Sequence, residues 1–150
     1  MLTLLAKNAS AQGADCATAD PFCTASGATF PASTSTVAPV GPNYGCLGSQ
    51  PNPAFYFLNI ATSGSLTLNI SSSAGVDIDF IAWGPFTSPG AACASGLTGS
   101  AVDCSYSTAA VETCLIPSAI VGEFYMILIT NFSGVPTNIS LTQTSGTGNI

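Results

Sequence analysis

The chain has 150 residues and a formal net charge of −6, with only 5% of its residues charged. Lys7 is the only basic residue, and there is neither Arg nor His. Phosphate binding needs Lys and Arg, and the common nucleophilic, zinc-dependent and phosphate-loop sites need His or Lys, so we expect neither nucleic-acid binding nor enzymatic activity.

The N-terminus predicts export. Residues 2–6 are a short apolar run, and Ala9-Ser10-Ala11 matches the small-residue pattern before a signal-peptide cleavage site. We therefore interpret residues 1–11 as a signal-peptide remnant and expect an extracellular or cell-surface protein, which is a fragment of a longer chain. No other stretch approaches the ~20 apolar residues of a membrane span.

Residues 12–53 form an extended arm that is rich in Ser, Thr and Pro and contains few strand signals. Such an arm is ordered only if crosslinks and aromatic anchors hold it. An even set of six cysteines in an exported chain predicts three disulfides. Sequence proximity favours the pairs Cys16–Cys23, Cys93–Cys104 and Cys46–Cys114.

Residues 54–150 are expected to form one antiparallel, all-β, two-sheet sandwich of jelly-roll-like layout, with the arm tied to it. Apolar runs recur about every ten residues between Gly- and Ser-rich turns, which is typical of sandwiches. Gly84 and Pro85 are expected to end the third strand, because Pro has no N–H for a sheet ladder. No helix is predicted. The expected strands cover residues 54–60, 65–70, 76–83, 111–116, 124–130 and 137–144.

One apolar core is predicted from the alternation along these strands. Residues 54–60 and 124–130 are apolar on both parities, as in strands that are covered on both faces. The expected members of the core are Phe55, Phe57, Leu66, Leu68, Ile78, Phe80, Tyr125, Ile127, Ile129, Ile139 and Leu141.

Four motifs occur in an order known from secreted bacterial proteins, at residues 51–57, 77–86, 102–107 and 125–131. They resemble the N-terminal β-sandwich module of type IX-secreted, gliding-motility-associated surface proteins. The layout is also similar to the bacterial pre-peptidase C-terminal domain. The resemblance implies a non-catalytic module of a large adhesin-like protein, whose partners are other domains of the same polypeptide and a surface glycan or protein.

Asp77 and Asp79 share one face of a strand, and Asp103 lies in the long connection that follows. Carboxylate oxygens suit a hard cation in an extracellular setting, which predicts calcium as the one candidate cofactor. The competing interpretation is that these acids accept backbone N–H groups at the rim of a sheet.

Trp83 and Tyr106 are candidate ligand-binding residues, since an exposed aromatic ring near a loop can form a platform for a sugar. The competing interpretation is that they fill the core, because Trp is largely buried on average. Two further functions stay open: a carbohydrate-binding module that serves a secreted hydrolase, and a self-assembling fibre subunit.

Overall fold

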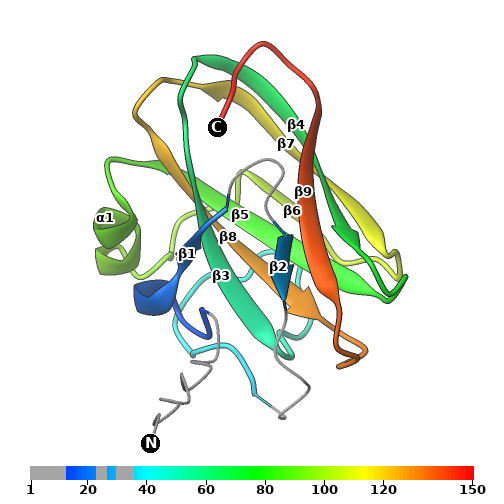
Figure 1. Cartoon of the computed structure of the whole chain (residues 1–150). Coiled ribbons are helices and arrows are strands. Elements are labelled where there is room, and N and C mark those ends of the chain that lie inside the picture. The colour runs from blue at the N-terminus through cyan, green and yellow to red at the C-terminus, as the bar shows by residue number, and fades with distance from the viewer. Residues whose placement is uncertain (1–12, 23–26, 30–35) are drawn as a thin grey trace, which may run out of the picture.

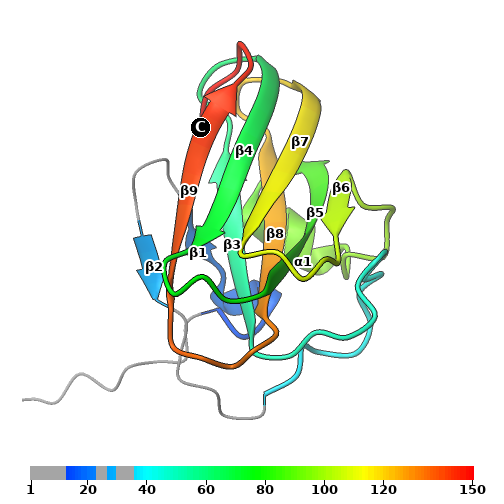
Figure 2. The ribbon, with the colours of Figure 1, turned by 90° about the vertical axis from the view of Figure 1, so that its right-hand side faces the viewer.

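A computed structural model, which describes residues 13–22, 27–29 and 36–150, shows two β-sheets packed face to face (Figures 1 and 2). The first sheet has the strand order β1–β3–β8–β5–β6, and the second has the order β2–β9–β4–β7. The two-sheet sandwich is therefore confirmed. The strands are β1 (Asp20–Pro21), β2 (Gly27–Thr29), β3 (Pro53–Asn59), β4 (Gly64–Ser72), β5 (Ile78–Phe86), β6 (Asp103–Ser105), β7 (Val111–Ala119), β8 (Phe124–Asn131) and β9 (Asn138–Ser145).

All strand pairs in the two sheets are antiparallel except the short pairing of β1 with β3, which is parallel. Both β1 and β2 come from the N-terminal arm, and each adds an edge strand to one of the sheets. The expected signal-peptide remnant at residues 1–11 lies outside the described residues. In the described ranges, every helix falls short of the length and apolar character that a membrane crossing needs.

The second sheet is buried on one face only. In β4 and β7 the buried positions alternate with more exposed ones, as the sequence pattern requires of a half-covered strand. The core between the sheets takes the inward side chains of both. Nine of the expected core residues belong to it: Leu66, Leu68, Ile78, Phe80, Tyr125, Ile127, Ile129, Ile139 and Leu141.

The first sheet is buried on both faces. Its outer face packs against the arm and helix α1 (Pro89–Ala94), which form a second core. Phe55 is buried in this second core, and Phe57 packs against it, so the prediction that they share one core with the other nine residues is wrong. Because β3 is apolar at both parities, its sequence shows that both of its faces are buried. The sequence does not show which face packs against the second sheet and which packs against the arm.

The expected disulfide pairs are also wrong. Cys16 bonds to Cys93 in α1, and Cys46 bonds to Cys104 in β6. The arm folds back across the outer face of the first sheet, and its cysteines therefore meet partners 77 and 58 residues away in the sequence. Cys114 carries a free, buried thiol in the core between the sheets. Cys23 lies outside the described residues.

Two local features differ from expectation. Helix α1 forms where no helix was predicted, because Ser88 accepts the Ala91 N–H as an N-cap and Pro89 suits the first helical position. Six residues are too few to give a periodic pattern. Strand β5 also continues to Phe86, since Gly84-Pro85 shifts the register with β8 without ending the strand. Gly84 is needed there, because a Cβ would lie 2.5 Å from the Tyr125 ring.

Candidate functional site

A pocket of about 150 Å³ opens at the edge of the first sheet where β5 begins and its two neighbours, β6 and β8, end. Ile78 at the start of β5 pairs with Asn131 at the end of β8, and Phe80 pairs with Ser105 at the end of β6. The residues just beyond these strand ends therefore converge. We call this the acidic–aromatic pocket, and its lining residues are Asp77, Asp79, Tyr106, Ser107, Thr108 and Phe132.

Asp79 is the most deeply buried acid of the pocket, with 2% of its surface exposed. Burial raises the pKa of its carboxyl to about 6, and the negative charges of Asp77 and Glu112 contribute to this rise. Hydrogen bonds from the Ser107 backbone and the Thr130 hydroxyl oppose the rise in pKa without cancelling it. The two hydrogen bonds therefore offset only part of the cost of burying a negative charge on Asp79.

Asp77 precedes β5, and its backbone carbonyl accepts the Phe132 N–H at 3.2 Å. Its side-chain Oδ1 atom is buried and has no hydrogen-bond partner within the described chain. A buried polar atom without a partner is costly and uncommon in folded proteins. The acidic part of the pocket therefore includes an acceptor that the described chain leaves unsatisfied.

Glu112 is a third acid near the pocket that the sequence interpretation missed. It is buried on the inward face of β7 and accepts the Ser107 hydroxyl at 2.6 Å. The alternation along β7 would have placed it inward, next to Cys114 and Ile116 on the same parity. Ser107 thus links Glu112 to the segment that lines the pocket.

Tyr106 and Phe132 form the aromatic wall of the pocket. Their exposed fractions are 45% and 49%, and their rings meet edge to face with centroids 6.4 Å apart. The arm holds Tyr106, whose hydroxyl lies 3.2 Å from the Ser49 hydroxyl. Gly48 allows this close approach, because a Cβ there would lie 3.1 Å from the Tyr106 ring. The nearby Cys46–Cys104 disulfide fixes the same part of the arm.

Asp103 does not join the other two acids. Its carboxylate accepts the Cys104 N–H at 2.8 Å and the Leu115 N–H at 2.6 Å, so it links β6 to β7. Within the described ranges, no three His, Cys, Asp or Glu side chains are grouped so that they could hold a metal ion. The expected ligand set Asp77, Asp79 and Asp103 is therefore not assembled.

Trp83 is not a surface platform. It is 1% exposed, its indole N–H donates to the Asn43 carbonyl at 3.0 Å, and its ring packs edge to face against Tyr44. The side chain anchors the arm on the outer face of the first sheet. Of the two aromatic residues proposed as ligand-binding, Tyr106 lies at the acidic–aromatic pocket.

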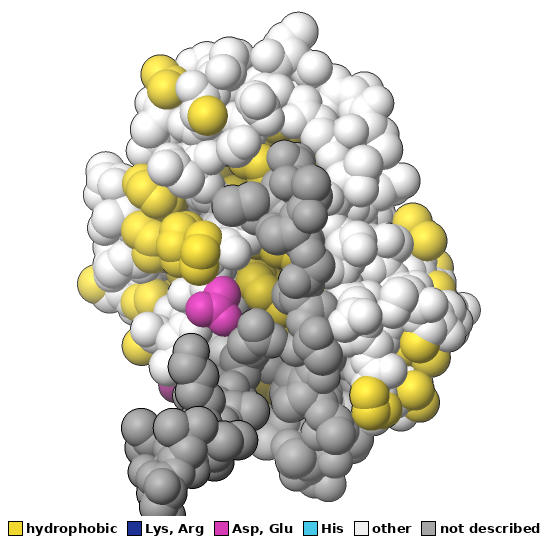
Figure 3. All heavy atoms as spheres, in the orientation of Figure 1, with side chains coloured by type: hydrophobic (Ala, Val, Ile, Leu, Met, Phe, Trp, Pro, Cys, Tyr) yellow, Lys and Arg dark blue, Asp and Glu magenta, His cyan; other side chains and the backbone are white. Residues whose placement is uncertain are grey.

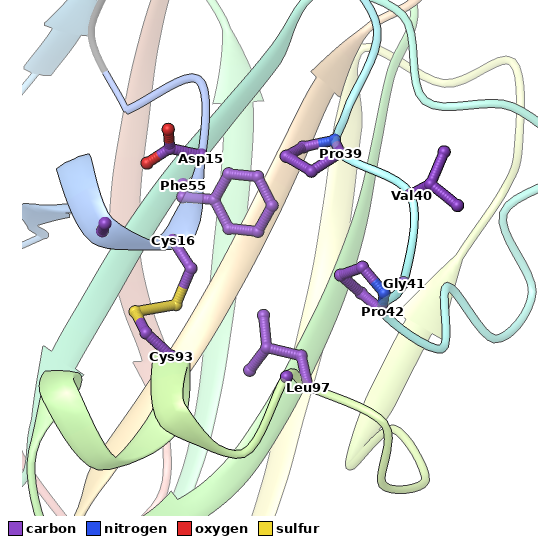
Figure 4. A pocket seen from close by; sticks show the side chains of 11 residues that line it. Asp15, Cys16, Pro39, Val40, Gly41, Pro42, Phe55, Cys93 and Leu97 are labelled. Atoms are coloured by element: carbon purple, nitrogen blue, oxygen red, sulfur yellow. A yellow bond between two sulfur atoms is a disulfide. The ribbon is translucent and has the colours of Figure 1, made fainter.

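A larger pocket of about 300 Å³ lies between the arm and α1 (Figure 4). Phe55 points into it between Asp15 and Pro39, and the Cys16–Cys93 disulfide and Leu97 lie beside it (Figure 4). Asp15 is engaged by the Thr18 backbone and hydroxyl. This pocket is apolar and offers no converging polar groups, so it specifies a ligand less well than the acidic–aromatic pocket.

No model of a protein family matches the chain, and no curated protein does. Among solved structures, it is similar to the pre-peptidase C-terminal domain of a collagenase from Bacillus anthracis, with 8% identity, a TM-score of 0.49 and coverage of 83% of this chain and 94% of that one. It is also similar to a periplasmic inhibitor of g-type lysozyme from Aeromonas hydrophila, with 14% identity, a TM-score of 0.43 and coverage of 84% and 96%.

Proposed function

We propose that the chain is an exported, non-catalytic module of a cell-surface protein and that it holds a partner at the acidic–aromatic pocket. The observation that carries the exported location is the pair of disulfides, which tie the arm to α1 and β6. Such crosslinks persist in oxidising compartments and are rare where cellular thiols are kept reduced. An exported location follows from their chemistry.

The surface and the pocket support the same role. On the face shown in Figure 3, apolar side chains lie in scattered patches on an uncharged polar surface, with acidic groups at few points. The pocket offers acids and aromatic rings, and the chain has no His to serve a hydrolytic mechanism based on a nucleophile–His pair or a His-bound metal. The four motifs that resemble type IX-secreted, gliding-associated proteins support a place in a large adhesin-like polypeptide.

Thiol trapping and protease shaving of the source cells test this proposal together. Intact cells are treated with a protease that does not enter them, and the cysteines are labelled with a maleimide before and after reduction. We expect the module to be removed from intact cells while a cytosolic marker survives. We also expect Cys16, Cys46, Cys93 and Cys104 to react only after reduction. A protease-resistant module whose four cysteines react at once would contradict the proposal.

A further inference from the structure

We propose that the acidic–aromatic pocket binds one basic side chain, the guanidinium of an arginine or the ammonium of a lysine, presented by a partner protein. The inference rests on the proposed role as a binding module and names the chemistry of the group that the module holds. Asp77 and Asp79 supply the acidic part of the pocket, and Tyr106 and Phe132 supply its aromatic wall.

Charge is the first reason. The only Lys or Arg of the sequence is Lys7, so the described part of the chain contains no basic side chain that could neutralise Asp77, Asp79 and Glu112. The Oδ1 atom of Asp77 is buried without a hydrogen-bond partner. A guanidinium or ammonium group supplies the missing positive charge together with N–H donors for the carboxylates that line the pocket.

Size is the second reason. One water occupies about 30 Å³ of liquid, so a pocket of about 150 Å³ has room for the equivalent of about five waters. That space suits a single long side chain and is too small for a folded segment or an oligosaccharide. The partner therefore contributes one residue to the pocket, and the rest of it lies on the surrounding surface.

The aromatic wall is the third reason. Cations are attracted to the faces of aromatic rings, and the aliphatic stems of Lys and Arg pack on apolar surface. Tyr106 and Phe132 are about half exposed at the pocket and stand edge to face, so they present ring surface to an incoming side chain. A neutral sugar would use the rings but would leave the repulsion between the carboxylates unrelieved. For a metal ion, the described residues contain no group of three His, Cys, Asp or Glu side chains that could hold it.

The test titrates the isotope-labelled chain with Nα-acetyl-arginine amide and Nα-acetyl-lysine amide and follows its backbone amides by NMR. The neutral analogue Nα-acetyl-citrulline amide, simple hexoses and calcium chloride are titrated in parallel. The chain carries Lys7→Gln, so that its own base cannot compete. We expect the basic probes to shift amides at residues 77–79, 105–108 and 130–132 and the neutral probes to shift none of them.

Matched variants assign the effect to the pocket. Asp77→Asn and Asp79→Asn should each weaken binding of the basic probes at least tenfold, and Tyr106→Ala and Phe132→Ala several-fold. Glu123→Gln removes one negative charge at the opposite end of β8 and should leave binding unchanged. The NMR spectrum of each variant reports whether it folds. If a variant does not fold, Thr108→Glu replaces it in the test, and this added negative charge in the pocket should strengthen binding of the basic probes.

Each contrary outcome overturns the inference. Equal shifts with citrulline and arginine would show that charge is not recognised, and pocket shifts with hexoses alone would assign the pocket to glycans. Shifts with calcium alone would assign it to a metal ion, and no shifts with any probe would leave it without a ligand of these classes. All of these results are independent of the export test, so the location of the module and the chemistry of its pocket can fail separately.

Discussion

The two faces of the first sheet are covered in different ways. One face packs against a second sheet, and the core between them consists of side chains from regular strands. The other face packs under the arm and α1, where much of the cover is irregular chain. Both disulfides lie in this second region, and the free thiol of Cys114 lies in the first.

This difference shows what each kind of cover requires. Backbone hydrogen bonds join the strands of the second sheet to one another. The inward side chains of these strands then pack together against the first sheet. An irregular arm gains few such bonds, and ordering it costs conformational entropy for every residue. The disulfides reduce the entropy of the unfolded chain instead, and they close loops long enough for this effect to be large.

Removal of the disulfides should have the largest effect. In the chain-entropy model, each of the two long loops corresponds to about 4 kcal/mol of stability. We expect the double variants Cys16→Ser/Cys93→Ser and Cys46→Ser/Cys104→Ser each to lose about 2–5 kcal/mol in the free energy of unfolding, measured with urea. The quadruple variant that lacks both disulfides should lose more free energy of unfolding than either double variant.

The same variants separate the two regions spectroscopically. Trp83 is the only tryptophan and belongs to the core under the arm, so its fluorescence should shift to the red as the cover loosens. The far-ultraviolet circular dichroism of the sheets should persist under the same conditions. Loss of both signals together would show that the two regions form one cooperative unit.

Two adjacent residues of β8 offer a matched pair of core substitutions. Ile127 faces the second sheet and Leu128 faces the arm, and both are fully buried. In the oxidised protein, Ile127→Ala and Leu128→Ala should each cost about 2–5 kcal/mol, as cavities in packed interiors do. Urea unfolding measures both.

In the protein without disulfides, the cost of Ile127→Ala should stay the same and the cost of Leu128→Ala should fall by half or more. Leu115→Ala is the control, because Leu115 is half exposed and should cost less than about 0.5 kcal/mol in either form. Equal costs for the two β8 variants in both forms would mean that the arm stays packed without its crosslinks.

The pH dependence of stability should show the smallest effect. The Asp79 carboxyl has a pKa of about 6 in the folded protein against 3.8 as its ordinary value, so the folded state binds more protons between these values. Stability should therefore rise by about 1–3 kcal/mol as the pH falls from 7.5 to 4, because a tenfold difference in proton affinity between the folded and unfolded states corresponds to about 1.4 kcal/mol. Asp77 and Glu112 are the charged groups that face this carboxyl.

Asp79→Asn should remove most of this rise and should make the protein more stable at pH 7.5. The matched variant Glu123→Gln should keep the rise. Urea unfolding at several pH values measures both. A profile that Asp79→Asn leaves unchanged would place the titrating group elsewhere in the chain.

The sequence predicted the regular parts of the fold because alternation and turn residues report local conformation. Apolar residues on both parities of 124–130 correctly indicated a strand covered on both faces, as Ile127 and Leu128 now show. The cysteine partners could not be predicted in the same way. They depend on how the arm returns over the sheet, and sequence proximity carries no information about that path.

The candidate site was predicted in part for a similar reason. Asp77, Asp79 and Tyr106 stood out by their chemistry, and they do lie together at one pocket. Phe132 was missed because β8 comes late in the sequence but inserts beside β5 in the sheet. Asp103 points to β7, and Trp83 to the arm, because the direction of a side chain is set by packing that a single strand does not encode.

Peptide mapping of the unreduced protein tests the arrangement of the arm most directly. Digestion with pepsin at low pH suppresses disulfide exchange. Cleavage near Phe22, Leu97 and Tyr106 places Cys16, Cys93, Cys104 and Cys114 in different peptides, so the observed pairs can be told from those expected from sequence proximity. Mass spectrometry should find peptides that join Cys16 to Cys93 and Cys46 to Cys104, with Cys114 in an unlinked peptide. A peptide that joins Cys93 to Cys104, or Cys46 to Cys114, would contradict the account of an arm that is crosslinked over the outer face of the sheet.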